Sequence, residues 1–401
     1  MASPFEFDVV VIGGGGHVGL PLAIAFADRG ASVVIYDTSE TSVDLINGGT
    51  MPFAEPGAEP MLARALASGS IHATTDAASV ATARNVVVVI GTPVDEHLNP
   101  DPNAIPKALD ACSQYFRDGQ LLVLRSTVYP GVTALVERMI AQLELDIPVA
   151  FCPERIAEHR AMTELFSLPQ IVSARTDAGR ARAAELFGLL TDAIVDLEPE
   201  EAELAKLFTN TWRYIKFAAA NQFYMMANDR GLDFERIRTG LTKDYPRASD
   251  MPGAGFAAGP CLLKDTMQLA AFSDNSFSLG HSAMLVNEGL PLYIVSQLEK
   301  KYDLANLTVG ILGMSFKAGS DDIRSSLSYK LRRVLKFRAR AVLGTDPYVD
   351  DSVDDTLLPL PLVLEKADIL VIATPHPEYR DLGTEKPVAD VWNLLGRGVV
   401  V

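Results

Sequence analysis

A glycine-rich loop between an apolar run and a helical pattern constrains the fold more than any other part of this sequence. The stretch VVVIGGGGHVGLPLAIAFADRG places Gly14, Gly16 and Gly19 in the spacing G-x-G-x-x-G, and Asp37 closes the next apolar run. Such glycines permit a tight turn and let a pyrophosphate approach the backbone at a helix N-terminus, while the acidic residue binds ribose hydroxyls. The order of these elements predicts a dinucleotide-binding domain. The alternative is a glycine turn that only packs a helix on a sheet.

The charges around the loop favour NAD over NADP. Asp37 would repel a 2′-phosphate, and no Lys or Arg follows it before Arg64. His17 and Val18 lie inside the loop, and we assign both to cofactor binding. A catalytic role for His17 is disfavoured because a residue of this loop faces the pyrophosphate rather than the nicotinamide.

Apolar, strand-like runs alternate with helical patterns in the first and last parts of the chain. The first part contains FDVVVIG, SVVIYD, NVVVVIGT, QLLVLRST, IPVAFCPE and PQIVSA, and the last contains LTVGILGMSF, ARAVLGTDP, ADILVIATP and KPVADVWN. Strands that are apolar on both faces and alternate with helices predict parallel sheets covered on both sides. Between them the pattern is helical, with one long helix from Glu198 that ends at Gly231.

We therefore predict an α/β fold with two Rossmann-like parallel-sheet domains joined by a long-helix central region. The predicted boundaries give an N-terminal NAD-binding domain at 1–197, a central helical domain at 198–301 and a C-terminal domain at 302–401. The apolar positions of the long helix cover more than one of its faces, which favours burial against another element or a second subunit.

Charge and composition argue against several classes of function. The formal net charge of −16 opposes binding to nucleic acid or to an anionic membrane, and no apolar run approaches the roughly 18 residues of a membrane span. The three cysteines lie far apart and the six histidines show no metal spacing, so we expect neither disulfides nor a metal. We expect a protein of the reducing cytoplasm.

One of the three cysteines stands out by its setting. Cys261 lies in GFAAGPCLLKDT, just before a helical pattern, and Lys264 follows one turn later. A helix N-terminus and a nearby ammonium both lower the pKa of a thiol. With NAD bound, a thiolate suggests aldehyde oxidation through a thiohemiacetal and a thioester. The alternative is a small apolar residue at a helix start, which is how we interpret Cys112 and Cys152.

Further polar residues are candidates by position. Lys206 and Asn210 lie four residues apart on the long helix and share one face with Glu203, although a solvated helix face is the usual explanation of such a trio. Glu154, Ser126 and Thr127 follow strands, where α/β sheets place ligand contacts.

Taken together, these motifs resemble those of the UDP-glucose/GDP-mannose dehydrogenase family over nearly the whole chain. The matching blocks are GGGHVGLPLA, LINGGTMPFAEPG, IGTPVDE, RSTVYPG, PER, ELAKLFTNTWR, AGPCLLKDT, GMSFKAGSDDIRSS and TDPY. The resemblance implies a cytoplasmic homodimer that oxidises C6 of a nucleotide sugar to a uronate in two NAD-dependent steps.

The resemblance also implies roles for individual residues. Cys261 would be the nucleophile, Lys206, Asn210 and Asp265 would surround the C6 oxygen and the attacking water, and Glu154 and Thr127 would position water for thioester hydrolysis. Cofactor contacts would include Thr92, Ser126, Lys264 and Arg324. Substrate contacts would include Glu154, Arg155, Lys206, Asn210, Phe256, Gly259, Phe316 and Lys317. Lys206, Lys264, Lys317 and Arg324 would then form the local positive cluster that an anionic ligand needs in an acidic protein.

Departures from the family pattern bear on the sugar. The sequence GFAAGPC has Ala257 and Ala258 where relatives often have glycine, and Asn221 is followed by Gln222 instead of Glu. CLLKDT resembles the UDP-glucose enzymes, whereas PER, NTWR and DVWN resemble the N-acetylhexosamine and mannosamine branches. We favour UDP-glucose, with a UDP-N-acetylhexosamine of the mannosamine type as the alternative.

Two other functions stay open. A two-electron β-hydroxyacid dehydrogenase shares the fold but needs no cysteine, so Cys261→Ser would leave its turnover intact. An inactive nucleotide-sugar-binding regulator would lack one of the Cys, Lys or Asp residues of the site, and all three residue types are present at the matching positions.

Overall fold

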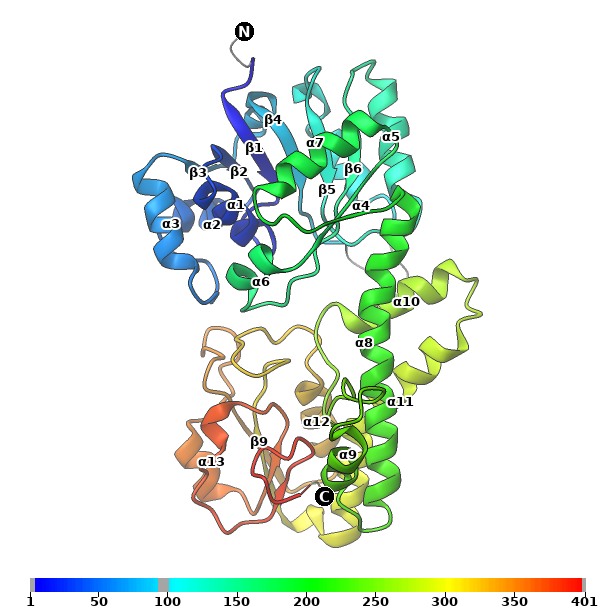
Figure 1. Cartoon of the computed structure of the whole chain (residues 1–401). Coiled ribbons are helices and arrows are strands. Elements are labelled where there is room, and N and C mark those ends of the chain that lie inside the picture. Colours follow the sequence, from blue (N-terminus) through cyan, green and yellow to red (C-terminus); the bar gives the residue numbers. More distant parts are fainter. Residues whose placement is uncertain (1–3, 93–100, 399–401) are drawn as a thin grey trace. The chain divides into compact units, whose positions relative to one another are not determined.

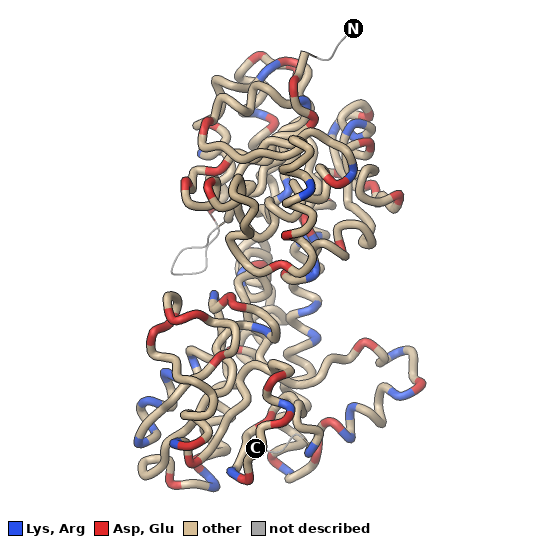
Figure 2. The backbone as a smooth tube through the Cα atoms, turned by 90° about the vertical axis from the view of Figure 1, so that its left-hand side faces the viewer, with Lys and Arg blue, Asp and Glu red and all other residues tan. Residues whose placement is uncertain are grey.

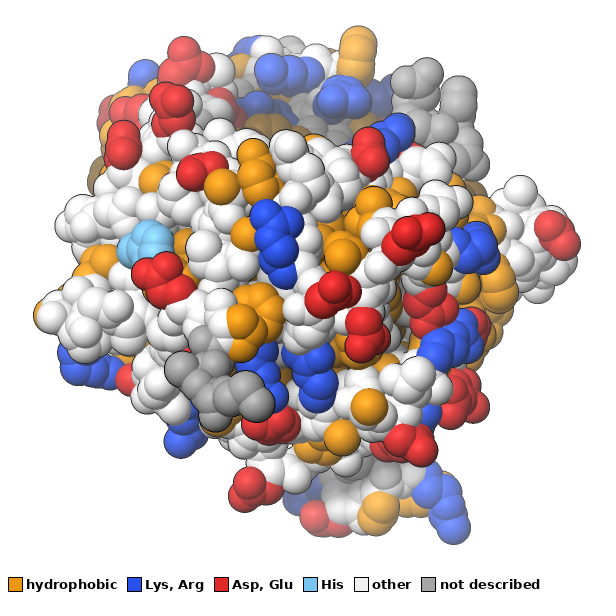
Figure 3. Space-filling model, turned by 90° about the horizontal axis from the view of Figure 1, so that it is seen from above, with side chains coloured by type: hydrophobic (Ala, Val, Ile, Leu, Met, Phe, Trp, Pro, Cys, Tyr) orange, Lys and Arg blue, Asp and Glu red, His pale blue; other side chains and the backbone are white. Residues whose placement is uncertain are grey.

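The computed structural model describes residues 4–92 and 101–398, which fall into two compact units, Met1–Phe208 and Thr209–Val401 (Figure 1). Residues 93–96 of the sequence block IGTPVDE lie outside the described residues. No helix in the described ranges is both long and apolar enough to cross a membrane. Acidic and basic residues are interspersed along both units (Figure 2) and are mixed with apolar side chains on the face shown in Figure 3.

Unit 1 is built on an eight-stranded sheet of order β3-β2-β1-β4-β5-β6-β7-β8. Its strands are β1 (Phe7–Ile12), β2 (Val33–Tyr36), β3 (Ile71–Thr74), β4 (Ala83–Val88), β5 (Leu121–Leu124), β6 (Val149–Phe151), β7 (Gln170–Ala174) and β8 (Ile194–Asp196). Neighbouring strands are parallel except β6 and β7, which pair antiparallel through Ala150 with Ala174. The expected all-parallel sheet is therefore wrong at this pair. The chain passes between β6 and β7 through a loop and a seven-residue helix, and this connection returns it in the opposite direction.

Both faces of the sheet are covered, as the doubly apolar strands predicted. Val9 and Val11 of β1 belong to one buried cluster, and Val10 and Ile12 of the same strand belong to another. The helices of unit 1 are α1 (Gly19–Asp28), α2 (Glu40–Asn47), α3 (Ala58–Ala67), α4 (Ala104–Asp110), α5 (Val132–Gln142), α6 (Ala161–Ser167) and α7 (Asp177–Gly188), with the 3-10 turns η1 (Ala77–Thr82) and η2 (Ser113–Tyr115). The first cluster includes residues of α1, α2, α3, α6 and α7, and the second includes residues of α4 and α5.

A 30-residue helix, α8 (Pro199–Asn228), begins in unit 1 and ends in unit 2. The predicted end at Gly231 lies three residues beyond the observed end at Asn228. Glu200 and Glu201 in its first turn oppose the positive end of the helix dipole. No strand occurs between residues 198 and 301, all of which the structure describes, as the helical pattern predicted.

Unit 2 combines helices with a parallel four-stranded sheet of order β10-β9-β11-β12. Its strands are β9 (Thr308–Leu312), β10 (Ala341–Thr345), β11 (Ile369–Ile372) and β12 (Val388–Ala389). Its helices are α9 (Phe234–Thr242), α10 (Leu262–Phe272), α11 (Ser278–Lys301), α12 (Leu327–Leu335) and α13 (Leu360–Lys366), with the 3-10 turns η3 (Leu304–Asn306) and η4 (Pro377–Tyr379). The second half of α8 packs with α11, α12 and the strands in one buried cluster. The three-domain division at 197/198 and 301/302 stays a prediction.

Candidate functional site

The loop after β1 has the shape that a pyrophosphate-binding loop needs. A Cβ at Gly14 would lie 2.8 Å from Cγ2 of Ile35, and one at Gly19 would lie 2.7 Å from the Cα of Gly14. A Cβ at Gly16 would meet nothing within 4 Å. Two glycines are thus required for close packing within the protein, and the middle one leaves open space at the start of α1. The residues present fit a dinucleotide.

Asp37 is held at the end of β2 by backbone amides. The N–H of Gly15 donates to its Oδ2 at 2.8 Å, and that of Ser39 donates to its Oδ1 at 3.0 Å. Each carboxylate oxygen can accept a second hydrogen bond, as a ribose diol requires. Within the glycine loop, the His17 ring packs on Phe53 with their centroids 4.0 Å apart, and Val18 occupies the N-cap position of α1.

The next two strand ends are joined through hydroxyl groups. Ser126 Oγ accepts a hydrogen bond from the N–H of Ile90 at 2.9 Å and donates one to its carbonyl at 2.7 Å. Thr92 Oγ1 donates to the carbonyl oxygen of Thr127 at 2.8 Å. The predicted residues Thr92, Ser126 and Thr127 therefore lie together beyond the carboxyl ends of β4 and β5, where parallel sheets bind ligands.

Glu154 anchors the loop that follows β6. One of its oxygens accepts a hydrogen bond from the guanidinium of the fully buried Arg125, which also donates to the Cys152 carbonyl at 2.9 Å. Its other oxygen accepts from the N–H groups of Arg155 and Ile156 at 2.6 and 2.9 Å. These contacts place the Glu154 carboxylate firmly at the strand end.

Arg155 has its guanidinium bound to the Pro169 carbonyl, and burial lowers the pKa of this side chain.

The first turns of α8 are fixed to unit 1 by Glu203. Its carboxylate is buried and accepts hydrogen bonds from the N–H of Gly131 at 2.7 Å, and from the N–H and hydroxyl of Thr133 at 2.8 and 2.5 Å. Glu203 thereby caps the N-terminus of α5, and the idea of a solvated helix face is wrong for this residue. Lys206 follows Glu203 by three residues on the same helix.

Cys261 occupies the N-cap position of α10 and is exposed. The other two cysteines are buried, as expected, and burial raises the pKa of the Cys112 thiol and raises that of Cys152 to about 12. Of the three cysteines, all within the described ranges, Cys261 is thus the one that a reagent or substrate in solution can reach.

One turn into α10, Asp265 places a carboxylate without any exposed surface. Asn210 of α8 donates a hydrogen bond to its Oδ2 at 2.6 Å, and Lys264 Nζ lies 3.6 Å from its Oδ1. The backbone N–H of Asp265 donates to the Cys261 carbonyl at 2.9 Å. Within unit 2 the structure therefore brings together Cys261, Asp265, Asn210 and Lys264 from two helices.

The loop that leads to Cys261 is pinned at its first residue. Asn221 of α8 accepts from the N–H of Gly255 at 2.9 Å, donates to its carbonyl at 3.0 Å and donates to Asn287 Oδ1. A Cβ at Gly255 would lie 2.2 Å from the Trp392 ring, against which Phe256 also packs edge-on. The presence of Gln222 in place of the family's usual Glu therefore leaves the contact between the Asn221 side chain and Gly255 intact.

A second anchor of this loop lies two residues before the cysteine. Gly259 has φ of +100°, and a Cβ there would lie 2.7 Å from the Phe316 ring. Its N–H donates to the carbonyl of Ser325 at 3.3 Å. The predicted substrate residues Phe256, Gly259 and Phe316 thus belong to one packed region of unit 2.

The cationic residues predicted for this region have nearby partners. Lys317 Nζ lies 5.5 Å from the centroid of the Phe316 ring, and Arg324 binds Asp322 with its Nη2 2.6 Å from Oδ2. Lys264 faces Asp265. Lys264 and Arg324 are thus paired with carboxylates, and a bound anion would share these two cations with them.

Several residues that shape these sites were not predicted as site residues. Arg125, Asn221, Asn287 and Trp392 are examples, and so are Asp346 and His376, described below. Asp346 had a signal, because it ends an apolar strand in TDPY as Asp37 ends one in YDT. The others act through contacts between distant segments and leave no local pattern.

The sequence matches the family models of three domains that belong to one family, in order along the chain. Residues 8–191 match the NAD binding domain of the UDP-glucose/GDP-mannose dehydrogenase family, 200–289 its central domain and 310–397 its UDP binding domain. The chain belongs to this family. It is accordingly an oxidoreductase that uses NAD, as its sequence predicted.

Members of the UDP-glucose/GDP-mannose dehydrogenase family resemble the chain over most of their length. UDP-N-acetyl-D-mannosamine dehydrogenase from Pyrococcus horikoshii is 29% identical over 389 residues, covering 94% of this chain and 91% of that protein. The solved structure of that enzyme gives a TM-score of 0.89 over 98% of this chain and 97% of that chain, at 28% identity. A UDP-glucose dehydrogenase from Pyrobaculum islandicum gives 0.90 over 97% and 95%, also at 28% identity.

Proposed function

We propose that this protein oxidises C6 of a UDP-N-acetylhexosamine of the mannosamine type to the uronate in two NAD-dependent steps. The proposal replaces UDP-glucose as the favoured sugar, because UDP-N-acetyl-D-mannosamine dehydrogenases from more than one organism resemble this chain over most of its length. UDP-glucose is the second candidate, supported by the similarity to the Pyrobaculum enzyme.

The observation that carries the proposed chemistry is the exposed Cys261 with a buried carboxylate one turn away. A helix N-terminus favours the thiolate of a cysteine placed there. The thiolate adds to the C6 aldehyde and gives a thiohemiacetal, whose oxidation gives a thioester that water hydrolyses. When bound, NAD accepts the two electrons of each oxidation. The alcohol, two NAD⁺ and one water thus give the carboxylate, two NADH and three protons.

The remaining site residues are assigned by their chemistry. We assign Lys206 and Asn210 to stabilising the oxygen at C6, where negative charge develops in both oxidations. Asp265 is assigned to accepting a proton from the water that attacks the thioester, and Thr127 and Glu154 to holding that water. Phe316 and Lys317 are assigned to the nucleotide part of the substrate.

The chain also carries an apolar surface suited to a second copy of itself. On α8, the apolar side chains of Trp212, Phe223 and Met226 are at least half exposed. Their spacing of 11 and 3 residues places them on one face of the helix. Leu285 and Leu292 of α11 are exposed as well. Exposed large apolar side chains in such numbers are typical of an interface, so we propose a homodimer. We place the reaction in the cytoplasm, which keeps the thiol reduced.

The experiment that tests the function measures NADH formed per sugar consumed. The panel contains UDP-N-acetylmannosamine, UDP-N-acetylglucosamine and UDP-glucose, with wild-type protein and Cys261→Ser. We expect two NADH per UDP-N-acetylmannosamine and no uronate from Cys261→Ser. A preference for UDP-glucose would establish the second candidate, and full turnover by Cys261→Ser would contradict the thiol mechanism.

A further inference from the structure

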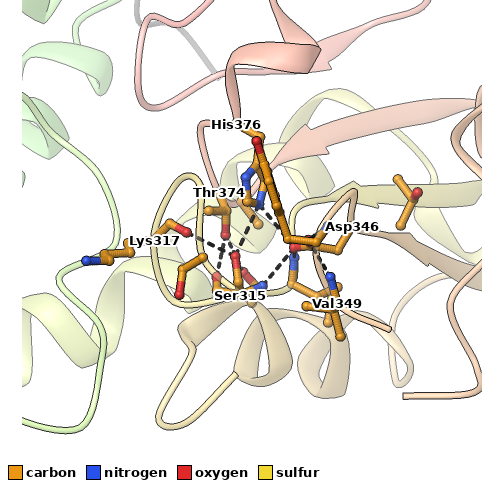
Figure 4. Close-up of polar contacts among 12 residues, drawn as sticks. Ser315, Lys317, Asp346, Val349, Thr374 and His376 are labelled. Atoms are coloured by element: carbon orange, nitrogen blue, oxygen red, sulfur yellow. Dashed lines mark hydrogen bonds and ion pairs between the residues drawn. The ribbon is translucent and has the colours of Figure 1, made fainter. Parts of the chain in front are cut away.

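A buried histidine and aspartate lie behind the loop to which we assign the nucleotide of the substrate. Asp346 follows β10, His376 follows β11, and Ser315 follows β9, so three neighbouring strand ends meet there (Figure 4). His376 Nε2 lies 3.1 Å from both Asp346 Oδ2 and Ser315 Oγ. The side chains of His376 and Asp346 have no exposed surface. None of the roles assigned above uses either residue.

Asp346 organises the backbone on both of its sides. Its Oδ2 accepts from the N–H groups of Met314 and Ser315 at 2.6 and 2.9 Å, in addition to His376. Its Oδ1 accepts from the N–H groups of Tyr348 and Val349 at 2.9 and 3.2 Å (Figure 4). Asp346 occupies the same place in its sheet as Asp37 does in unit 1, but its lone pairs are taken by the protein. It is therefore not placed to bind a ribose.

The hydrogen bonds define which nitrogen of the His376 ring carries the proton. The N–H of Gly319 donates to Nδ1 at 3.2 Å, which requires that Nδ1 carry no proton. The proton of the neutral ring is then on Nε2, which donates toward Asp346 Oδ2. Ser315 Oγ donates to the Lys317 carbonyl at 3.0 Å and so accepts from the same Nε2 proton. His376 thus connects Asp346 to both ends of the 315–319 turn.

The backbone of Ser315 is held a second time. Its carbonyl accepts hydrogen bonds from Thr374 Oγ1 at 2.6 Å and from Ser326 Oγ at 3.2 Å (Figure 4). The turn between Ser315 and Gly319 presents Phe316 and Lys317, and the Phe316 ring packs directly against Gly259 of the loop that ends at Cys261. A shift of this turn would therefore act on the nucleotide contacts and on the thiol loop together.

We propose that His376 and Asp346 are a positioning pair that sets the conformation of the 315–319 turn for the UDP part of the substrate and, through Phe316 and Gly259, supports the loop of Cys261. The inference rests on the proposed function, which assigns this turn to the nucleotide. Neither residue is proposed to touch the reacting atoms.

The test compares binding of UDP and of NAD by the full-length protein in titration calorimetry. His376→Gln keeps a donor near the position of Nε2 but loses the acceptor for Gly319, and His376→Asn keeps that acceptor but loses the donor. Ser315→Ala removes only the hydroxyl that bridges His376 and the Lys317 carbonyl. It keeps the test possible if the His376 variants do not fold. His72→Gln, an exposed histidine of β3, is the matched control. We expect both His376 variants to raise the Kd for UDP by about tenfold, the cost of one or two lost hydrogen bonds, and to leave the Kd for NAD unchanged.

A second readout reports on the thiol loop. Iodoacetamide alkylates the exposed Cys261 ahead of the two buried cysteines, so its rate can be followed by intact mass. We expect the His376 variants and Ser315→Ala to change this rate and the control to match wild type.

If the wild-type protein binds UDP and the His376 variants bind it equally tightly, the inference is overturned. An equal loss of UDP and NAD binding in all three variants would overturn it too, because it would mean general damage to the fold. A wild-type protein that binds NAD but not UDP would instead overturn the nucleotide assignment, and the inference with it.

Discussion

At the scale of single residues, the aspartates that follow β2 and β10 differ in their hydrogen-bond partners. Asp37 meets two backbone amides, while Asp346 meets four amides and a histidine. The same residue type at the same place in a related topology thus has fewer protein partners in unit 1, where we propose that it binds the ribose of the cofactor, than in unit 2. Sequence position alone does not separate the two roles, because the partners of Asp346 come from other strand ends.

Replacing the Asp37 carboxylate by an amide tests its role in choosing the cofactor. Asp37→Asn keeps an acceptor for the N–H of Gly15 and removes the negative charge. We expect the Kd for NAD to rise about tenfold, because hydrogen bonds to a charged acceptor are the stronger ones, and NADP to become a usable cofactor. Steady-state kinetics with both cofactors measure the change. Unchanged discrimination against NADP would contradict the assignment.

Gly259 allows a test of the thiol loop. An alanine there meets both an unfavourable φ and the Phe316 ring at 2.7 Å. We expect Gly259→Ala to lower kcat by at least about tenfold, since a displacement of about 1 Å at a nucleophile can cost far more. Gly253→Ala is the matched control, because a Cβ at Gly253 meets nothing within 4 Å. Equal activity of the two variants would show that the loop tolerates the shift.

At the scale of elements, the long and strongly patterned segments were predictable and the short ones were not. Periodicity gave the four strands of the second sheet and the extent of α8 to within three residues. The strands β3 and β8 were missed because each is short, with four and three residues, and carries only two apolar side chains. The reversal of β7 was missed because an apolar run carries no information on strand direction. The burial of Glu203 was not predictable, because its partners, Gly131 and Thr133, are distant in sequence.

The free energy of unfolding should depend on pH through Asp346, which holds the start of the 315–319 turn. Burial alone would raise its pKa, but hydrogen bonds from His376 and from the amides of Ser315 and Tyr348 hold this pKa below its usual value. A carboxyl with a lowered folded-state pKa stabilises the protein fully above its unfolded value of 3.8, and this contribution is lost as the pH falls through the folded-state pKa. We expect Asp346→Asn to lower the free energy of unfolding at pH 7. The difference from wild type should shrink below about pH 4.

Urea denaturation from pH 7 to pH 3 measures this difference. Asp351→Asn is the control, because that carboxylate is exposed and lies in the loop after β10, away from the strand ends. A difference that stays constant across the range would assign the effect to packing instead of to charge.

At the scale of the whole molecule, the alternation of strands and helices was enough to predict two α/β regions around a helical middle. The site was predictable only in part. The setting of Cys261 and the helix position of Asn210 made them candidates, the resemblance added Asp265, and the structure brings these three together. The contacts that hold them, such as Gly255 against Trp392 and Gly259 against Phe316, join segments that are distant in the sequence, and no local pattern predicts them.

The proposed homodimer can be tested by breaking the apolar face of α8. We expect Met226→Glu to convert the protein to monomers, because a charge buried at an interface without a partner is costly. Phe337→Glu serves as the control, since Phe337 is 85% exposed and lies just after α12. Light scattering after size exclusion gives the mass of each variant. A wild-type protein that is already monomeric would remove the dimer from the proposal.

The packing of Trp392 against the start of the cysteine loop gives the protein a built-in optical reporter. The chain has two tryptophans, and the other, Trp212, is 58% exposed on α8. The indole N–H of Trp392 donates to the Ala373 carbonyl at 3.2 Å, and its ring faces Gly255 and Phe256. In a Trp212→Phe background, emission therefore comes from one indole in contact with the segment that leads to Cys261. Movements of that segment during turnover can be followed by stopped-flow fluorescence without any added dye.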